Sequence, residues 1–184
     1  MDNGASSYRR FLAGDDNGLA DIIRAYRDGL IFYLNGFVND IHTAEDLAED
    51  VFIKIAVKKP AFREKSSFKT WLYAIGRNEA YQNLRRRKLV YVPLDALPEA
   101  ADLYEAPETG YFRTEQYRAL HACMARVKSE YHQVLWLYYF ENFSAKEISA
   151  VMHRSVHNVD TLLCRARKAV KRELEKEGFN DENL

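Results

Sequence analysis

Apolar residues recur every three or four positions along most of this chain, which is the period of an α-helix that buries one face. In the first half the spacing predicts three helices, over 19–37, 44–58 and 68–88. Thr43 is placed to cap the second of them and Pro60 to end it, and Ser67 is placed to cap the third. No stretch alternates apolar and polar residues as a half-buried strand would, so the pattern predicts an all-α fold.

The helical pattern stops between Leu89 and Thr109, where three prolines stand among acidic residues. Such a segment cannot sustain a long helix and is typical of a linker between domains. We therefore expect two small helical domains joined by a flexible acidic linker. Their predicted bounds are 1–90 and 113–177, with the linker over 91–112 and a short tail over 178–184.

The last quarter of the chain has the pattern of a helix-turn-helix. Ser144 and Glu147 have the spacing of a capping box, and Ser155 is placed to cap a second helix. That second helix is expected to bury Val156, Val159, Leu163, Ala166 and Val170 and to expose His157, Asn158, Thr161, Arg165 and Lys168. A short helix, a tight turn and a polar, basic second helix are typical of proteins that enter a DNA major groove.

Charge is unevenly distributed, although the formal net charge of the 184 residues is zero. Residues 61–88 carry a net charge of +6 and 116–177 a net charge of +4, whereas 89–115 carry −5. Local charge, not the sum, determines attraction to phosphate. Two basic segments separated by an acidic one indicate two DNA-contacting modules.

The first basic segment mixes cations with aromatic residues. Positive charge attracts phosphate, and an exposed ring such as Trp71 offers an unstacked base a surface to stack on. Asn78 and Gln82 lie about one turn apart and have the chemistry to hydrogen-bond base edges. In the alternative interpretation, Phe68 and Trp71 belong to the core and the run of basic residues 85–88 only keeps the helix end soluble.

The helix predicted over 44–58 has an acidic outer edge that includes Asp46, Glu49 and Asp50. Negative residues near a helix N-terminus suit its dipole, so a solvated face is one interpretation. The other is a docking strip for a basic partner. Neighbouring carboxylates on this helix point in different directions, which argues against a metal site.

Other function classes lack support in the sequence. The two cysteines, Cys123 and Cys164, have no metal-type spacing and suit a reduced cytoplasmic protein. No signal peptide is expected, and the longest apolar runs are too short to span a bilayer. The five histidines are scattered, and no phosphate loop or catalytic motif is present. We expect neither an enzyme nor a cofactor.

Two separated blocks resemble one family. Residues 44–88, with Ala-Glu-Asp-Leu-Ala-Glu-Asp-Val-Phe at their start and Phe-Lys-Thr-Trp-Leu-Tyr-Ala-Ile-Gly-Arg-Asn from Phe68, resemble region 2 of the extracytoplasmic-function sigma factors. Residues 114–175, with Glu147-Ile148, Ser155 and Arg165-Ala-Arg, resemble region 4 of the same group. The resemblance implies an alternative sigma factor that binds bacterial core RNA polymerase, recognises promoter DNA at its −10 and −35 elements, and pairs with an anti-sigma protein.

By this resemblance, each surface has a role. Polymerase docking falls to Asp46, Glu49, Asp50 and Phe52. A loop over 60–67 cradles a base flipped out of the −10 element, and the residues assigned to that element are Phe62, Arg63, Lys65, Ser66, Trp71, Arg77, Asn78, Gln82 and Arg85. The residues assigned to the −35 element are Ser144, Arg154, Ser155, His157, Asn158, Thr161 and Arg165.

Two positions of the recognition helix depart from the family pattern. Asp160 and Leu162 stand where a lysine and an arginine are usual, which removes positive charge where DNA contacts are expected. Either the −35 contact differs or is weaker, or Leu162 packs against a neighbouring helix or an inhibitor. Two rival functions stay open at this point: a stand-alone helix-turn-helix regulator, and a polymerase-binding adaptor that has lost promoter reading.

Overall fold

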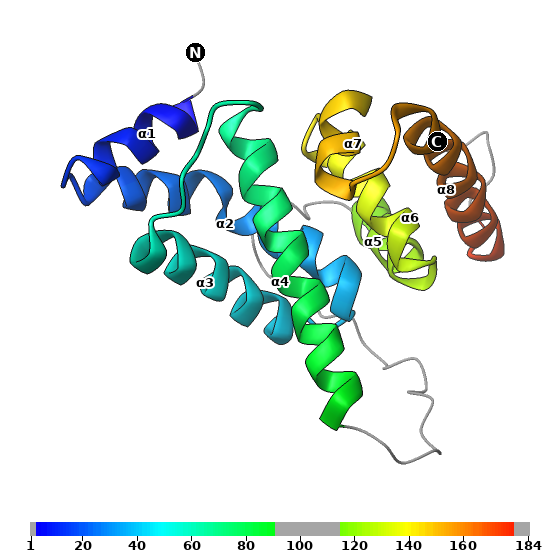
Figure 1. The fold of residues 1–184 in the computed structure, drawn as a ribbon. Coiled ribbons are helices and arrows are strands. Elements are labelled where there is room, and N and C mark those ends of the chain that lie inside the picture. Colours follow the sequence, from blue (N-terminus) through cyan, green and yellow to red (C-terminus); the bar gives the residue numbers. More distant parts are fainter. Residues whose placement is uncertain (1–2, 91–114, 179–184) are drawn as a thin grey trace.

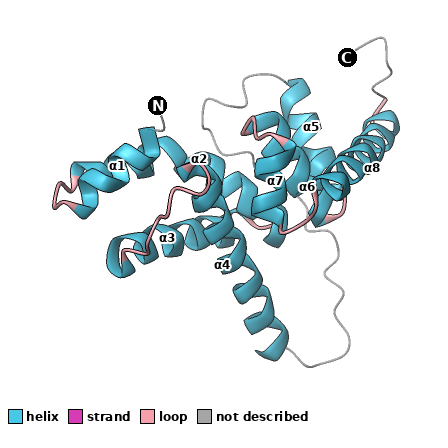
Figure 2. Ribbon diagram, turned by 45° about the horizontal axis from the view of Figure 1, so that its top comes forward, coloured by secondary structure: helices cyan, strands magenta, loops and turns pink. Residues whose placement is uncertain are grey.

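The computed structural model describes residues 3–90 and 115–178, so the predicted linker and the end of the tail lie outside the described residues. Every regular element in the described ranges is a helix (Figure 2). In chain order these are α1 (Asn3–Leu12), α2 (Asn17–Val38), α3 (Ile41–Lys58), α4 (Phe68–Val90), α5 (Glu115–Arg126), α6 (Ser129–Leu135), the π-helix η1 (Trp136–Phe140), α7 (Ala145–Met152) and α8 (Val156–Lys176). The all-α prediction is confirmed.

Helices α1 to α4 form one bundle, in which α4 crosses α2 and α3 and then extends beyond them (Figure 1). The three predicted helices are present with small differences at their ends. Ser67 caps α4, since its Oγ accepts the Thr70 amide at 3.2 Å. The cap of α3 was predicted wrongly: the helix begins at Ile41, and the Asp40 carboxylate accepts the Thr43 amide at 3.2 Å. Thr43 therefore supplies the first-turn donor, and Asp40 is the cap.

Helix α1 was not predicted from the sequence. Its ten residues are largely polar, yet Tyr8 and Phe11 are 1% and 5% exposed because they insert between α2, α4 and the 60–67 loop. Gly14 in the following turn has a φ of +98°, which a glycine adopts without strain. The chain thereby reverses direction and starts α2.

Helices α5 to α8 form the second bundle, and the predicted helix-turn-helix is α7 followed by α8. The capping box of α7 is complete: Glu147 donates its amide to Ser144 Oγ and accepts the Ser144 amide at Oε2, 2.9 Å away. Ser155 caps α8 by accepting the Asn158 amide at 3.2 Å. The expectation that Val156 is buried was wrong; it is 42% exposed, since residues 153–158 all lie at the surface and the buried stripe of α8 starts at Val159.

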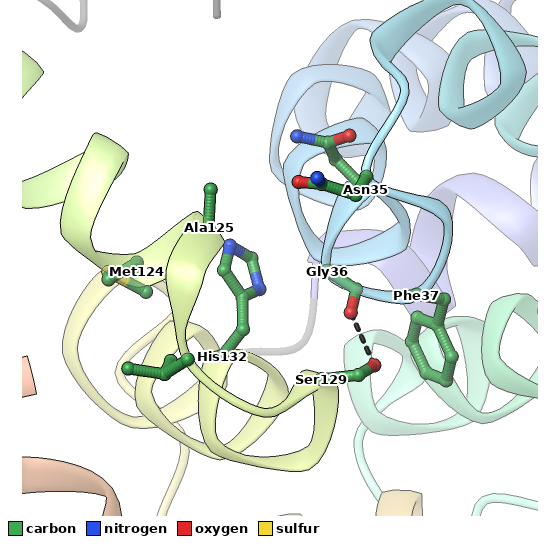
Figure 3. Close-up of a pocket in the computed structure, with 9 residues that line it drawn as sticks. Asn35, Gly36, Phe37, Met124, Ala125, Ser129 and His132 are labelled. Atoms are coloured by element: carbon green, nitrogen blue, oxygen red, sulfur yellow. Dashed lines mark hydrogen bonds between the residues drawn. The ribbon is translucent and has the colours of Figure 1, made fainter. Parts of the chain in front are cut away.

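The two bundles pack against each other, with α2 facing α6 and η1, and α4 facing α7. Two glycines of α2, Gly29 and Gly36, lie seven positions apart on the same face of the helix and allow this approach. A Cβ on Gly36 would lie 2.0 Å from His132 Nδ1, and one on Gly29 would lie 2.3 Å from Glu141 Oε1. Figure 3 shows Ser129 donating its hydroxyl to the Gly36 carbonyl beside His132. A small cavity of about 130 Å³ remains there, between the end of α2 and the α5–α6 turn.

Candidate nucleic-acid interface

Four of the predicted DNA-contacting residues form one line along α4. At about 100° per residue, Trp71, Asn78, Gln82 and Arg85 fall within roughly 60° of one another around the helix. Trp71 is half-buried, and the other three side chains are exposed. We call these four residues the α4 stripe. The structure thus aligns on one side of α4 four residues that are spread over about four helical turns.

Arg77 lies outside the α4 stripe, about 100° around the helix from Asn78. Its guanidinium carbon lies 4.6 Å from the centre of the Tyr81 ring, and the side chain is half-buried. A cation over an aromatic ring is held in a fixed orientation. Arg77 therefore occupies the edge of the surface rather than its centre.

The loop over 60–67 lies next to the N-terminal end of the α4 stripe. Arg63 and Lys65 are exposed and Ser66 is half-buried. The Phe62 ring packs on Trp71 with a centroid distance of 5.3 Å and meets Phe68 edge-on at 5.6 Å. Phe68 is fully buried, as expected. The loop therefore combines two exposed cations with a half-buried aromatic pair, Phe62 and Trp71, which we call the aromatic floor.

On α3 the acidic edge continues into an apolar one. Asp46, Asp50, Ile53 and Val57 follow a 4-3-4 spacing and share one face, which we call the α3 stripe, with Glu49 beside it. Ile53 and Val57 are 57% and 75% exposed, although both are large and apolar. The sequence interpretation did not assign them a role. Their spacing already put these two apolar residues outside the predicted buried stripe of the helix, which was a signal that they are exposed.

Phe52 needs a correction as a docking residue. Its side chain is 6% exposed and belongs to the core of the first bundle. It lies roughly 120° around the helix from the α3 stripe, so it cannot reach a partner that sits on that stripe. The exposed apolar residues of this helix are Ile53 and Val57 instead.

The second candidate surface is the exposed face of α8, where several polar groups are already engaged within the protein. Ser144 and Ser155 use their hydroxyls as helix caps, and Thr161 donates its hydroxyl to the His157 carbonyl at 3.0 Å. Arg154 forms an ion pair with Glu130, with Nη2 and Oε2 2.6 Å apart. His157, Asn158 and Arg165 are exposed along the helix and carry the free side-chain chemistry of this face.

The two departures from the family pattern have different environments. Leu162 is 5% exposed and forms part of the core of the second bundle, so packing within the chain accounts for it. Asp160 is exposed on the same turn as Thr161. Only Asp160 therefore changes the charge of the surface that would face DNA.

A polar cluster joins the two bundles at the N-terminus of α4. Lys69 Nζ lies 2.7 Å from Glu141 Oε2 and 5.2 Å from the centre of the Phe143 ring. Glu147 Oε1 accepts the Ser67 hydroxyl at 3.3 Å, while its Oε2 closes the capping box. Although burial raises the pKa of Glu147, these hydrogen bonds hold it below its usual value. One carboxylate thus serves the helix-turn-helix and the contact between bundles.

Neither a metal centre nor a membrane span emerges from the described part of the chain. Its His, Cys, Asp and Glu side chains do not gather in threes in a way that could hold a metal ion. Within the same ranges, no helix combines the length and apolar character needed to cross a bilayer. The candidate surfaces in the described ranges consist of exposed charged and polar side chains beside half-buried aromatic ones.

Comparison with known families and curated proteins gives consistent matches. Residues 22–90 match the family model of sigma-70 region 2, and residues 117–170 match that of sigma-70 region 4. The chain is 30% identical over 163 residues to the RNA polymerase sigma factor YlaC of Bacillus subtilis, covering 87% of this chain and 94% of that protein. It is 28% identical over 171 residues to the ECF RNA polymerase sigma factor SigW of the same organism, covering 88% and 91%.

Solved structures show the same fold. The sigma factor RpoE of Bartonella quintana, crystallised with the anti-sigma factor NepR, aligns with a TM-score of 0.65 at 19% identity, covering 85% of this chain and 96% of that one. CnrH, in complex with the cytosolic domain of CnrY, aligns with a TM-score of 0.64 at 16% identity, covering 95% and 96%. Both bundles of this chain therefore have counterparts in known folds.

Proposed function

The chain belongs to the extracytoplasmic-function group of sigma-70 RNA polymerase sigma factors and is an alternative sigma factor. We propose that its two bundles divide polymerase docking and recognition of the two promoter elements as follows. The first bundle, within residues 1–90, docks on polymerase and engages the −10 element. The second bundle, within 113–177, engages the −35 element. The observation that carries this division is that each family region supplies its own exposed polar face, on α4 in one case and on α8 in the other.

The α3 stripe is the proposed docking surface for core polymerase. Asp46 and Asp50 offer negative charge at one end, and Ile53 and Val57 offer exposed apolar surface at the other. A line of residues at 4-3-4 spacing suits a partner helix, and its charge suits a basic one. Glu49 adds a third carboxylate at the edge.

The α4 stripe and the 60–67 loop together form the proposed −10 surface. Arg63, Lys65 and Arg85 attract the phosphate backbone, and the Phe62–Trp71 pair provides a surface on which an unstacked base can lie. Asn78 and Gln82 have the donors and acceptors to distinguish base edges. Taking a base out of the stack costs energy, which a preformed surface and polymerase binding offset.

On α8, Asn158 and Arg165 are the proposed major-groove readers and His157 flanks them. The other four assigned residues support the helix-turn-helix: Ser144 caps α7, Ser155 caps α8, Thr161 bonds within α8, and Arg154 pairs with Glu130 of α6. Any contact that they make with DNA adds to that structural role. Asp160 weakens the attraction of this face for phosphate. We therefore propose a −35 contact that depends on few side chains.

Promoter geometry requires the two bundles to separate. Sites about 25 base pairs apart lie about 85 Å apart along B-DNA. A compact chain of 184 residues has a radius of gyration of only about 16 Å. The 24 residues between Val90 and Glu115 make 25 Cα–Cα steps and can reach at most about 90 Å, slightly more than this separation, so both faces can engage their elements. The α4–α7 and α2–α6 contacts are therefore proposed to open on the promoter.

The proposal extends to partners and compartment. Two proteins of the same fold were solved as complexes with an anti-sigma factor or a cytosolic domain of a second protein, which supports an anti-sigma partner for this chain as well. A partnership with core polymerase and promoter DNA supports a location in the bacterial cytoplasm, which we propose for this protein. We infer that it has no catalytic activity of its own and that polymerase performs the chemistry.

The decisive experiment is in vitro transcription with purified protein and core RNA polymerase on a library of genomic fragments, followed by sequencing of transcript starts. Discrete starts that share upstream −10 and −35 motifs, and that core alone does not produce, are the expected result. Tight polymerase binding without specific starts would point to an adaptor. DNA binding without any polymerase binding would point to a stand-alone regulator.

The docking surface has its own test. The double change Glu49→Lys and Asp50→Lys reverses two exposed charges and is expected to weaken polymerase binding by about tenfold or more. Glu175→Lys, an exposed charge reversal on α8, serves as the matched control. If the double variant binds polymerase as tightly as the control, the α3 stripe is not the docking surface.

A further inference from the structure

Helix α1 contacts the proposed −10 loop through Tyr8 and Arg9. It lies outside the segment that matches the region 2 family model, which begins at residue 22. We propose that Tyr8 of this helix is a positioning residue that holds the 60–67 loop in the shape that receives the flipped base. The inference rests on the proposed function of that loop. It assigns a role in promoter opening to an element that neither the sequence pattern nor the family match singled out.

The Tyr8 hydroxyl is the direct link between the two elements. It donates a hydrogen bond to the Pro60 carbonyl with an O···O distance of 2.7 Å, across 52 positions of sequence. The ring is 1% exposed, and burial raises the pKa of its hydroxyl, so the group stays a neutral donor over the whole physiological range. The first residue of the loop is thereby fixed to α1.

The same ring supports the aromatic floor of the proposed site. Its centroid lies 5.5 Å from that of Phe68 and 5.4 Å from that of Trp71. Phe62 packs on the same Trp71 from the loop side at 5.3 Å. Tyr8 therefore contacts, with one side chain, the start of the loop and the residue at the head of the α4 stripe.

One further contact from α1 reaches the loop, and a second reaches Lys59, the residue just before it. Arg9 forms an ion pair with Glu64, with Nη1 and Oε1 3.3 Å apart, and Lys59 Nζ lies 4.9 Å from the centre of the Phe11 ring. The Arg9 and Glu64 side chains are 64% and 58% exposed, so we assign this pair only a minor share of the restraint. The restraint is strongest at Pro60 and weaker in the middle of the loop.

The loop needs outside restraint because part of its backbone is in a costly conformation. Within the loop, Glu64 has a φ of +53°, in the left-handed region that residues with a Cβ rarely adopt. Lys59, with a φ of +44°, is the C-cap that ends α3 just before the loop. Such conformations persist where surrounding contacts determine them, and they cluster at binding sites. Between these two residues lie Phe62 and Arg63, whose positions the loop shape sets.

A role in folding alone is the competing explanation, because Tyr8 is also a core residue. The change Tyr8→Phe separates the two roles, since it keeps the ring and its aromatic contacts and removes only the hydroxyl. A structural role predicts a uniform loss in every activity of the protein. A positioning role predicts a loss confined to the −10 strand.

The test uses holoenzyme assembled from core polymerase and the full chain. The probe is a single-stranded non-template oligonucleotide that spans the −10 element of a promoter at which the wild-type protein directs transcription. Tyr8→Phe is expected to weaken binding of this probe about five- to tenfold, the scale of one lost hydrogen bond. Affinity for core polymerase and for a duplex that carries only the −35 element is expected to stay unchanged.

The neighbouring arginines of α1 give a matched pair of controls. Arg9→Gln removes the contact with the loop and is expected to weaken probe binding about twofold. Arg10→Gln removes ion pairs with Asp15 and Asp21, which tie α1 to its own turn and to α2, and is expected to leave probe binding unchanged. A larger effect of Arg10→Gln than of Tyr8→Phe would overturn the positioning role.

The remaining outcomes also decide the question. If Tyr8→Phe binds the probe like the wild type, or loses all three affinities equally, Tyr8 does not position the loop. The double change Arg63→Ala and Lys65→Ala tests the loop itself. If that variant binds the probe normally, the proposed −10 role of the loop fails, whatever Tyr8 does.

Discussion

The two polar faces of this sigma factor differ in how much of their chemistry remains free. On α4 the stripe residues Asn78, Gln82 and Arg85 are exposed, and the half-buried Trp71 rests on an aromatic cluster beneath it. On the helix-turn-helix of α7 and α8, four of the seven residues that the sequence pointed to are engaged in caps, an ion pair or a bond to their own helix. A polar residue beside a DNA-binding helix is therefore as readily a support for that helix as a reader of bases.

The largest expected effect compares the two faces directly. Asn78→Ala with Arg85→Ala is expected to slow open-complex formation by about tenfold or more, because a good contact with a base edge is worth about 1–3 kcal/mol and the arginine adds attraction to phosphate. His157→Ala with Arg165→Ala is expected to weaken −35 duplex binding by roughly three- to tenfold. Potassium permanganate footprinting and duplex titration measure the two losses.

Arg24→Ala is the control for this comparison, since Arg24 is an exposed cation on α2 away from both faces. It is expected to change neither quantity by more than about twofold. Polymerase affinity should be unaffected in all three variants. A greater loss from the α8 pair than from the α4 pair would reverse the ranking of the two faces.

A second change acts on the junction between the two bundles. Gly36→Ala places a methyl group against the buried His132 ring and is expected to destabilise the α2–α6 contact by about 1–3 kcal/mol. The gain in helix propensity, about 1 kcal/mol, offsets part of this loss. Hydrogen exchange should show α6 amides losing protection while those of α3 keep it.

Ser129→Ala is the milder control at the same junction, because it removes only the hydroxyl that bonds to the Gly36 carbonyl. Its effect on α6 protection should be in the same direction and smaller. If Gly36→Ala lowers protection evenly through both bundles, they unfold as one unit. In that case opening at this junction is not a separate step.

A third change tests whether Ser155, the serine that caps α8, also reads DNA. Ser155→Ala removes the acceptor of the Asn158 amide and is expected to lower the free energy of unfolding by about 1 kcal/mol, measured by chemical denaturation. Ser155→Thr keeps the cap and should behave like the wild type. The ratio of specific to non-specific duplex affinity should stay constant in both. A falling ratio in Ser155→Ala alone would make Ser155 a base reader.

A smaller effect is expected at the exposed departure from the family pattern. Asp160→Lys should tighten −35 duplex binding about three- to fivefold. A plot of the logarithm of affinity against the logarithm of salt concentration should become steeper by about 0.9, the value for one added phosphate contact. Asp160→Asn removes the negative charge without adding a positive one and should give roughly half that gain. Equal affinities for all three proteins would place Asp160 beyond the reach of phosphate.

Local signals in the sequence predicted the helices and their caps well. The Ser144–Glu147 capping box and the Ser67 and Ser155 caps depend on contacts within four residues, and all three were predicted correctly. The α4 stripe follows from helical spacing alone. The cap of α3 was the one local feature among these that was predicted wrongly. Asp40 and Thr43 stand three positions apart and both have side chains that can cap a helix, and the structure uses Asp40.

Contacts between distant segments were beyond the reach of such signals. Helix α1 has few apolar residues, and its stability comes from Tyr8 and Phe11, which pack where α1 meets α2 and also contact Pro60 and Lys59, roughly 50 positions away. The exposure of Ile53 and the burial of Phe52 depend on which side of α3 meets the core. Gly36 looks like a poor helix residue until His132, nearly one hundred positions later, is seen to occupy the space.

The smallest expected effect is a pH dependence that again distinguishes the two bundles. The pKa of Glu147 lies below its ordinary value of 4.5 in the folded chain, so its carboxylate stabilises the fold above that value, and this contribution is lost as the pH falls through the lowered pKa. The Asp40 cap of α3 follows the same rule from a lower starting value of 3.8, because the Thr43 hydroxyl holds its pKa down. On acidification the contribution of the α7 cap should therefore begin to fade before that of the α3 cap. Urea unfolding of Glu147→Gln and of Asp40→Asn between pH 3 and 6 tests this order, with each free energy of unfolding compared with that of the wild type. As the pH falls, the loss of stability caused by Glu147→Gln should begin to shrink at a higher pH than the loss caused by Asp40→Asn. A loss for Glu147→Gln that stays constant down to pH 3 would mean that the carboxylate charge has no part in joining the helix-turn-helix to α4.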